Sequence, residues 1–552
     1  MRTRTPCHCW LGLFALSAGA AFGQEPAGTP ATGTKHTPGQ GLYARHCAAC
    51  HGEQGDARGL AALFLYPKPR DFRGGKYRLV STNNNVPTRD DLNAVLLRGM
   101  PGSSMPSWAH LNQADRDLLV DEIVRLTGDG ARARYIRKLK DQDQLTEEDI
   151  KAPDVQEEIK AYAVRQTTPG PMTEVPAIAD PDAAAIARGK ELYTRQSCHS
   201  CHGAEGKGDG VQKMIDDEGF VMRPRDLTRG IYKGGHDINS LYLRILSGMP
   251  GTPMPASKNL KPEEISDMVH FLRSLSSEEQ RQAPILKRER IVARKVAALP
   301  ADSDERAWRV APPVHVRLTP LWWRDDAVPA VQVQAVHDGR SVAFRLEWAD
   351  AVANTHAGQV QAFKDAVAME LVAGSEEPFL GMGSPTAPID LWMWDADRGQ
   401  PGGELEEVNP RVVVDVYPFS EKVAESAEYA RPGTKTAQQP DLALPAQAVG
   451  NRIARSTAHP TGGSSLAAAG PGSTTFRVKK SQLVSATGRW SEGRWTVLLR
   501  RSLAVATPED GIGLAPGQTA SVAFAVWEGA HRDRNGQKQV SIWQELVLEA
   551  AR

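Results

Sequence analysis

Two copies of the pattern Cys-x-x-Cys-His constrain this sequence more than any other feature. The first consists of Cys47, Cys50 and His51, and the second of Cys198, Cys201 and His202. Thiols at this spacing can join the two vinyl groups of one porphyrin as thioethers, and the adjacent histidine then lies under the iron as an axial ligand. A redox dithiol would need no trailing histidine, and a zinc site would need another ligand pair nearby. The motifs therefore predict two covalently attached haem c groups.

Both motifs belong to longer repeats. The corresponding segments are Leu42–Arg45 and Leu192–Arg195, Pro69–Phe72 and Pro224–Leu227, and Arg98–Pro106 and Ser247–Pro255. Each copy ends in a helical pattern, at residues 115–126 and 262–275. Two copies at so long a period indicate duplicated domains rather than a solenoid.

Each repeat resembles a class I cytochrome c domain, which we expect over residues 36–128 and 183–276. In that family a methionine on a loop before the last helix is the second axial ligand of the iron. The resemblance favours Met105 and Met254, which precede proline deep in the loop, and leaves Met100 and Met249 as alternatives. A thioether ligand raises the reduction potential. Iron with both axial positions filled carries electrons and leaves no open position for a substrate.

The N-terminus predicts export. Arg2 and Arg4 precede the apolar stretch Trp10–Phe22, and Ala21–Gly23 forms a small-x-small cleavage site. These features are typical of a signal peptide, here residues 1–23, and the apolar stretch is shorter than the roughly 20 residues that span a bilayer. The remaining two cysteines, Cys7 and Cys9, lie before this stretch. We therefore expect a periplasmic protein without an integral membrane span.

Charge is balanced along the chain, with 66 Lys and Arg against 66 Asp and Glu. This balance argues against nucleic-acid binding, which requires a basic surplus. Residues 129–182 begin basic and turn acidic, which favours a solvated helical hairpin between the repeats, with partner docking as the weaker alternative. Residues 277–307 are charged and are expected to form a helical linker.

The composition changes after residue 307, where ten of the twelve tryptophans lie. Apolar and polar residues alternate over 331–336 and 341–346 around Asp338-Gly339, which predicts a β-hairpin, and residues 490–495 have the same character. Further strand candidates are 367–372, 389–394, 412–417, 521–527 and 540–548. Many short strands with turns predict an antiparallel β-sandwich over residues 308–552, and the Gly/Pro/Ala-rich residues 400–475 are interpreted as a long excursion from it.

Several segments of this region resemble the haem-binding γ subunit of ethylbenzene dehydrogenase. They are Phe344–Asp350, Phe363–Ala368, Phe379–Gly383, Ile389–Trp394 and Ala525–Ala530. The resemblance implies a β-sandwich that holds one non-covalent haem b between a methionine and a lysine. Met382 matches the ligand segment, Lys538 is the favoured lysine and Lys480 is the runner-up. Met369 and Met393 lie at strand positions and are expected to pack in the core.

The sequence thus predicts two all-α cytochrome c domains followed by an all-β antiparallel sandwich. The expected function is transfer of electrons between a periplasmic redox enzyme, such as a molybdenum enzyme with an iron–sulfur partner, and another carrier, without catalytic residues of its own. One alternative is a di-haem cytochrome whose sandwich is a haem-free binding or sensing module. A di-haem peroxidase is disfavoured, because it needs an open distal site and both repeats contain methionine loops.

Overall fold

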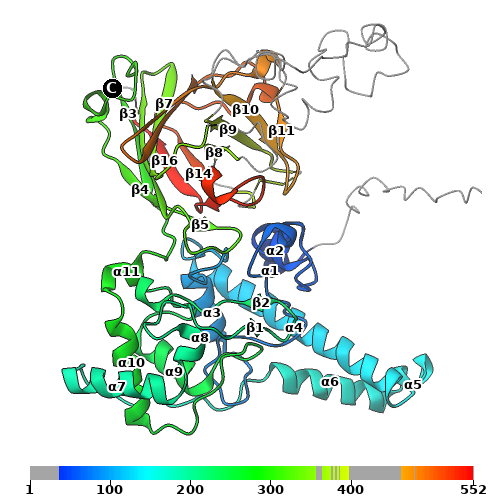
Figure 1. The fold of residues 1–552 in the computed structure, drawn as a ribbon. Helices are drawn as coiled ribbons and strands as arrows, with labels where there is room; N and C mark the ends of the chain where they lie inside the picture. Colours follow the sequence, from blue (N-terminus) through cyan, green and yellow to red (C-terminus); the bar gives the residue numbers. More distant parts are fainter. Residues whose placement is uncertain are drawn as a thin grey trace, which may run out of the picture. The chain divides into compact units, whose positions relative to one another are not determined.

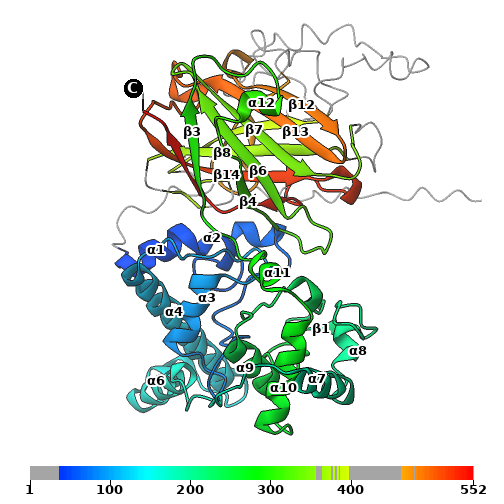
Figure 2. The same ribbon diagram turned by 90° about the vertical axis from the view of Figure 1, so that its left-hand side faces the viewer.

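The computed structural model describes residues 36–355, 363–374, 377–379, 382–384, 386–396, 462–477 and 479–550 (Figures 1 and 2). The expected signal peptide and the strand candidate 412–417 lie outside these residues. Within them, helices occupy the N-terminal part and strands the C-terminal part, so the predicted fold class is confirmed. No helix of this part is both long enough and apolar enough to cross a membrane.

The two repeats form similar helical units. The first contains α1 (Pro38–His46), α2 (Ala48–His51), η1 (Leu60–Phe64), α3 (Arg89–Arg98) and α4 (Gln113–Asp141). The second contains α7 (Ala183–Arg195), α8 (His199–His202), the hairpin β1 (Met214–Ile215) and β2 (Val221–Met222), η2 (Leu227–Arg229), α9 (Ile238–Ser247) and α10 (Pro262–Ser274). Equivalent glycines let the first and last helix of each unit approach closely, since a Cβ on Gly39 would lie 2.9 Å from the Leu118 carbonyl oxygen and one on Gly189 2.1 Å from that of Asp267.

A helical hairpin connects the units, as the sequence predicts. A domain boundary was expected at Gly128, but helix α4 continues past it. The nearby Gly130 allows the helix to pack closely against the backbone of Arg73, since a Cβ on Gly130 would lie 2.4 Å from the Arg73 Cα. Figure 1 shows α6 (Pro153–Thr167) beside α4, with α5 (Glu147–Lys151) at the turn. The hairpin has its own small core of Leu139, Ile150 and Ile159, and is therefore more than a solvated connection.

The C-terminal strands form one continuous sheet that folds into two layers (Figure 2). In sequence they are β3 (Arg290–Lys295), β4 (Val314–Arg317), β5 (Thr319–Pro320), β6 (Ala330–His337), β7 (Ser341–Ala349), β8 (Ala366–Ala373), β9 (Ile389–Asp395), β10 (Ser464–Ala468), β11 (Thr475–Phe476), β12 (Ser485–Ser491), β13 (Arg494–Ser502), β14 (Thr519–Trp527), β15 (Gln539–Val540) and β16 (Gln544–Leu548). Their spatial order is β11-β10-β9-β8-β14-β16-β3-β6-β7-β13-β12. Pairings are antiparallel except for β16–β3 and β3–β6. Phe344, Trp392 and Phe524 are buried in the core between the layers.

Both predicted hairpins are confirmed, β6–β7 and β12–β13. Three other expectations need correction. The helical linker 277–307 contains only the short helices α11 (Glu278–Gln282) and α12 (Glu305–Trp308), and residues 290–295 are strand β3, whose Ile291 and Ala293 are buried between charged neighbours. The candidate strand 540–548 is interrupted, because the pairing with β14 shifts by one residue between β15 and β16. The end of the expected excursion, residues 464–468, is strand β10.

The hairpin core provides a test of independent packing. Replacing the fully buried Ile159 by alanine should destabilise α6 by roughly 2–5 kcal/mol, since methyl groups are lost and a cavity remains. Hydrogen exchange of the α6 amides would measure the effect. The control is Val164→Ala on the same helix, where the side chain is 54% exposed and a change within about 0.5 kcal/mol is expected. Equal exchange in both variants would contradict the packing described here.

Candidate functional site

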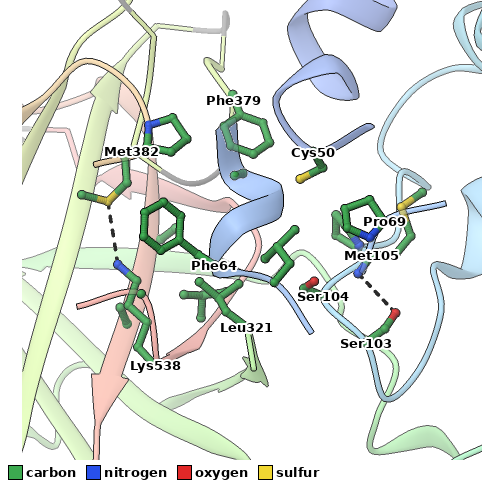
Figure 3. Close-up of a pocket in the computed structure, with 18 of the residues that line it drawn as sticks. Cys50, Phe64, Pro69, Ser103, Ser104, Met105, Leu321, Phe379, Met382 and Lys538 are labelled. Carbon is green, nitrogen blue, oxygen red and sulfur yellow. Dashed lines mark hydrogen bonds between the residues drawn. The ribbon is translucent and has the colours of Figure 1, made fainter. Parts of the chain in front are cut away.

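One cavity of about 810 Å³ contains the first Cys-x-x-Cys-His motif at one end and the Met382–Lys538 pair at the other (Figure 3). The first cytochrome unit and the sheet both contribute to its wall. Phe64 and Leu321 lie between the two ends in Figure 3. The structure therefore brings the candidate ligands of two different groups into a single space.

His51, the candidate axial ligand of the first unit, is held by a backbone carbonyl and an aromatic ring. Its Nδ1 lies 2.9 Å from the carbonyl oxygen of Arg70, and its ring stacks on Phe72 with centroids 4.5 Å apart. An Nδ1–H donor on this carbonyl leaves Nε2 as a free electron-pair donor. Burial lowers the pKa of His51 to about 4, so the imidazole is neutral at physiological pH, as a metal ligand must be.

The second unit repeats this arrangement more loosely. Nδ1 of His202 lies 3.5 Å from the carbonyl oxygen of Arg225, and burial lowers the pKa of His202. Tyr43 and Tyr193 also correspond, since their hydroxyl groups donate to the carbonyl oxygens of Gly52 and Gly203 at 2.9 and 2.7 Å. The repeated sequence thus encodes the same support for both histidines.

The four motif cysteines are free thiols. Burial raises the pKa of both Cys47 and Cys50 to about 12, which favours the protonated thiols. In the second unit the Cys201 sulfur lies 3.4 Å from Oε1 of Gln212. None of these cysteines is used in a disulfide, so all four are available for thioether bonds.

Each methionine loop is closed by the same hydrogen bonds. The backbone N–H of Met100 donates to the carbonyl oxygen of Met105 at 3.1 Å, and Met249 donates to Met254 at 3.2 Å. In the first loop the hydroxyl of Ser103 donates to the Met100 carbonyl and accepts from the Met105 N–H. Both Met100 and Met105 line the cavity, but only Met105 packs against the buried core of the unit. This packing favours Met105 as the ligand.

The sheet supplies the other wall through the alternation of its strands. Residues of β8 and β14 with large side chains, such as Met369 and Phe524, point into the sandwich core. The alternate residues that face the cavity include small ones, namely Ala366, Ala368, Ala523 and Ala525. Small side chains on this face leave space for a flat group. Met369 is buried in the core between the layers, as expected. Met393 packs against the hydrophobic cluster that contains these alanines and also lines the cavity.

Met382 and Lys538 point toward one another across the cavity, with Nζ 3.8 Å from Sδ (Figure 3). Met382 has a φ of +93°, which residues with a Cβ rarely adopt, and such strain often accompanies ligand clamps. Burial lowers the pKa of Lys538, which favours the neutral amine that an iron ligand requires. Glu370 lies beside them, and burial raises its pKa to about 7, opposed by Lys538 and by the Met382 N–H. The runner-up, Lys480, is exposed.

These residues fit haem. The cavity offers a thiol pair with a neutral imidazole at one end and a soft sulfur facing a desolvated amine at the other. Trp108 lines the cavity, and its indole N–H has no hydrogen-bond partner among the described residues, so a polar group of a bound molecule can accept from it. Haem supplies a one-electron iron couple when it is bound.

Sequence reasoning missed several contributors to the site. The carbonyl oxygens of Arg70 and Arg225 belong to the repeated Pro-Arg-Asp segment. The occurrence of this segment in both repeats was the sequence signal that could have indicated a shared role. Glu370 and the cavity-facing alanines lie at alternate positions of predicted strands. The sequence alone does not show which of the two strand faces points to the cavity and which packs against the second layer of the sandwich. Leu321, from the loop after β5, had no sequence signal.

Comparison with known proteins divides the chain into three matches. Residues 305–539 match the ethylbenzene dehydrogenase family, residues 186–276 match the cytochrome c family, and residues 34–121 match subunit III of cbb3-type cytochrome c oxidase. The resemblances seen in the sequence are therefore confirmed for all three regions.

Individual relatives cover less than half of this chain. A putative respiratory nitrate reductase haem subunit from Haloferax mediterranei is 26% identical over 44% of this chain and 67% of its own length. The γ subunit of chlorate reductase from Ideonella dechloratans is 25% identical over 45% of this chain and 79% of its own length. Among solved structures, the reducing HAO-like protein complex of Kuenenia stuttgartiensis is 30% identical, with a TM-score of 0.36, over 44% of this chain and 97% of that one.

The methionine loop can be tested at one hydroxyl. Ser103→Ala removes the acceptor of the Met105 N–H, so this amide should exchange about fivefold faster, corresponding to roughly 1 kcal/mol. Hydrogen exchange measured on a peptide that contains Met105 would show it. Ser104→Ala is the matched control, because no hydrogen bond of the Ser104 side chain is found in the described part of the chain. Identical exchange in the two variants would show that the Ser103 hydroxyl does not support the loop.

Proposed function

This chain joins two cytochrome c domains to a domain of the ethylbenzene dehydrogenase family, and we propose that it is an exported electron-transfer subunit with two haem c groups and one haem b. That it transfers electrons and is not a catalytic subunit is inferred from its domains and from its relatives, which are named as a nitrate reductase haem subunit and a chlorate reductase γ subunit. The number and type of the haems, the ligands, the direction of transfer and the partners belong to the proposal.

The shared cavity is the observation that supports this proposal most. A haem-free binding module would have no need for a partly buried sulfur and a desolvated amine that face each other at 3.8 Å. In the proposed assignment His51 and Met105 bind the first iron, His202 and Met254 the second, and Met382 and Lys538 the third. The cysteine pairs Cys47–Cys50 and Cys198–Cys201 attach the first two groups covalently.

The proposed partners are redox proteins outside the cytoplasm. The relatives are named as subunits of nitrate and chlorate reductases, so we place a reductase-type enzyme, of the molybdenum class, at the sheet domain. The cytochrome c domains would exchange electrons with a second carrier. Covalent haem attachment and the N-terminal sequence together support the periplasm as the location.

The first test is the haem content of the purified chain. Extraction with acidified solvent removes haem b but leaves thioether-linked haem c on the protein, so pyridine haemochrome spectra of the two fractions should give two haem c and one haem b per chain. A chain with no extractable haem would favour the alternative in which the sheet domain binds no haem.

The third haem site can be tested by its two side chains. Met382→Ala and Lys538→Leu should each weaken or shift the extractable haem signal, because leucine and alanine cannot bind iron and one axial bond is lost, and should leave the covalent haem bands unchanged. Absorption spectra of the reduced proteins provide the measurement. Lys480→Leu, which removes an exposed lysine, is the matched control and should leave all signals unchanged. A change confined to the covalent bands would contradict the ligand assignment.

A further inference from the structure

One residue of the second cytochrome domain reaches the cavity of the first. Among the described residues that line the cavity, Lys233 is the one that comes from this domain. It follows the buried Tyr232 between η2 and α9. The preceding tyrosine marks its counterpart in the first domain, where Tyr77 precedes Arg78, and Arg78 also lines the cavity.

The other cations around Lys233 have partners. Arg78 pairs with Asp216 at 2.7 Å, and Arg70 pairs with Glu218 at 2.6 Å. Arg225 donates to the Gly102 carbonyl oxygen at 2.5 Å and lies over the ring of Trp323. For the Lys233 amine, the described part of the chain offers no hydrogen bond and no ion pair.

Lys233 is half-buried in the cavity wall, and its amine has no hydrogen-bonded anion among the described residues. Burial, followed by the positive charges of Arg225, Arg78 and Arg70, lowers the pKa of Lys233 well below its usual value, and the carboxylate of Asp216, which is paired with Arg78, opposes the shift only in part. An amine that is removed from water without a hydrogen-bonded anion costs free energy, and an anion at hydrogen-bond distance offsets that cost. Arg78 offers a second donor, because its Nε is buried and unpartnered within the described residues.

We propose that Lys233 binds a propionate carboxylate of the haem attached at Cys47 and Cys50, so that the second cytochrome domain completes the haem site of the first. The inference rests on the proposed function, since it requires haem in this cavity. Lys233 acts as a positioning residue, because it touches the porphyrin edge and not the iron. Its charge also opposes the additional positive charge of the oxidised iron.

The reduction potential of one covalent haem is the expected readout. In Lys233→Met the oxidised state gains relative stability, so the ratio of reduced to oxidised haem at a fixed potential should fall about tenfold, equivalent to ~59 mV for a one-electron couple. Spectroelectrochemical titration of the full chain measures this ratio. Lys233→Arg should retain the potential. The covalent haem whose potential falls in Lys233→Met should be the same haem whose potential falls in a Met100→Ala, Met105→Ala double variant. That double variant identifies the first haem, since loss of a thioether ligand lowers the reduction potential.

Three outcomes would overturn the inference. The first is an unchanged potential in Lys233→Met. The second is an equal shift in Lys190→Met, which removes the same charge from an exposed position on α7. The third is a Lys233→Met shift that appears only in inorganic phosphate buffer, because a free anion and not a propionate would then occupy the site. A missing extractable haem, by contrast, would contradict the proposed function and leave this result interpretable.

Discussion

The cavity depends on a short backbone pairing between the first cytochrome domain and the sheet domain. The N–H of Tyr66 donates to the carbonyl of Leu321, and the N–H of Trp323 donates to the carbonyl of Tyr66. The rings of Tyr66 and Trp322 stack with centroids 5.1 Å apart. Because Leu321 also donates to the Lys538 carbonyl, the same loop holds the backbone of a candidate iron ligand. This pairing therefore places the two sets of candidate ligands in one cavity.

Close packing at the same interface explains why small residues recur there. A Cβ on Gly536 would lie 2.6 Å from a ring carbon of Phe64, so the turn before Lys538 tolerates only glycine without displacement of η1. A Cβ on Gly102 would lie 2.8 Å from the ring of Trp323. Both contacts join a segment that carries a candidate ligand to a neighbouring domain. Packing between the domains therefore sets the distance between the candidate iron ligands of the first cytochrome domain and those of the sheet domain, as much as the fold of each domain does.

The sequence predicted what is local and repeated, and it missed what depends on a distant partner. The cysteine motifs, the methionine loops and the hairpins were recognisable because spacing and alternation carry the information. Strand β3 was missed because its buried residues, Ile291 and Ala293, are few among charged ones. The contribution of Lys233 could not be predicted, since nothing in a single repeat indicates that its side chain serves the other copy.

The two cytochrome copies therefore differ mainly in their surroundings. Their internal supports correspond: a tyrosine hydroxyl on a glycine carbonyl, an arginine carbonyl near the histidine, and a closed methionine loop. In the first copy, Phe64 of η1 lies against Gly536 of the sheet domain and is 37% exposed, whereas Ile215, at the same distance after the second motif, is 60% exposed. Duplication supplied two copies of one binding unit, and a few non-repeated contacts then gave each copy a different neighbour. Those contacts, and not the haem motifs, distinguish the first site, which shares a cavity with the sheet domain, from the second.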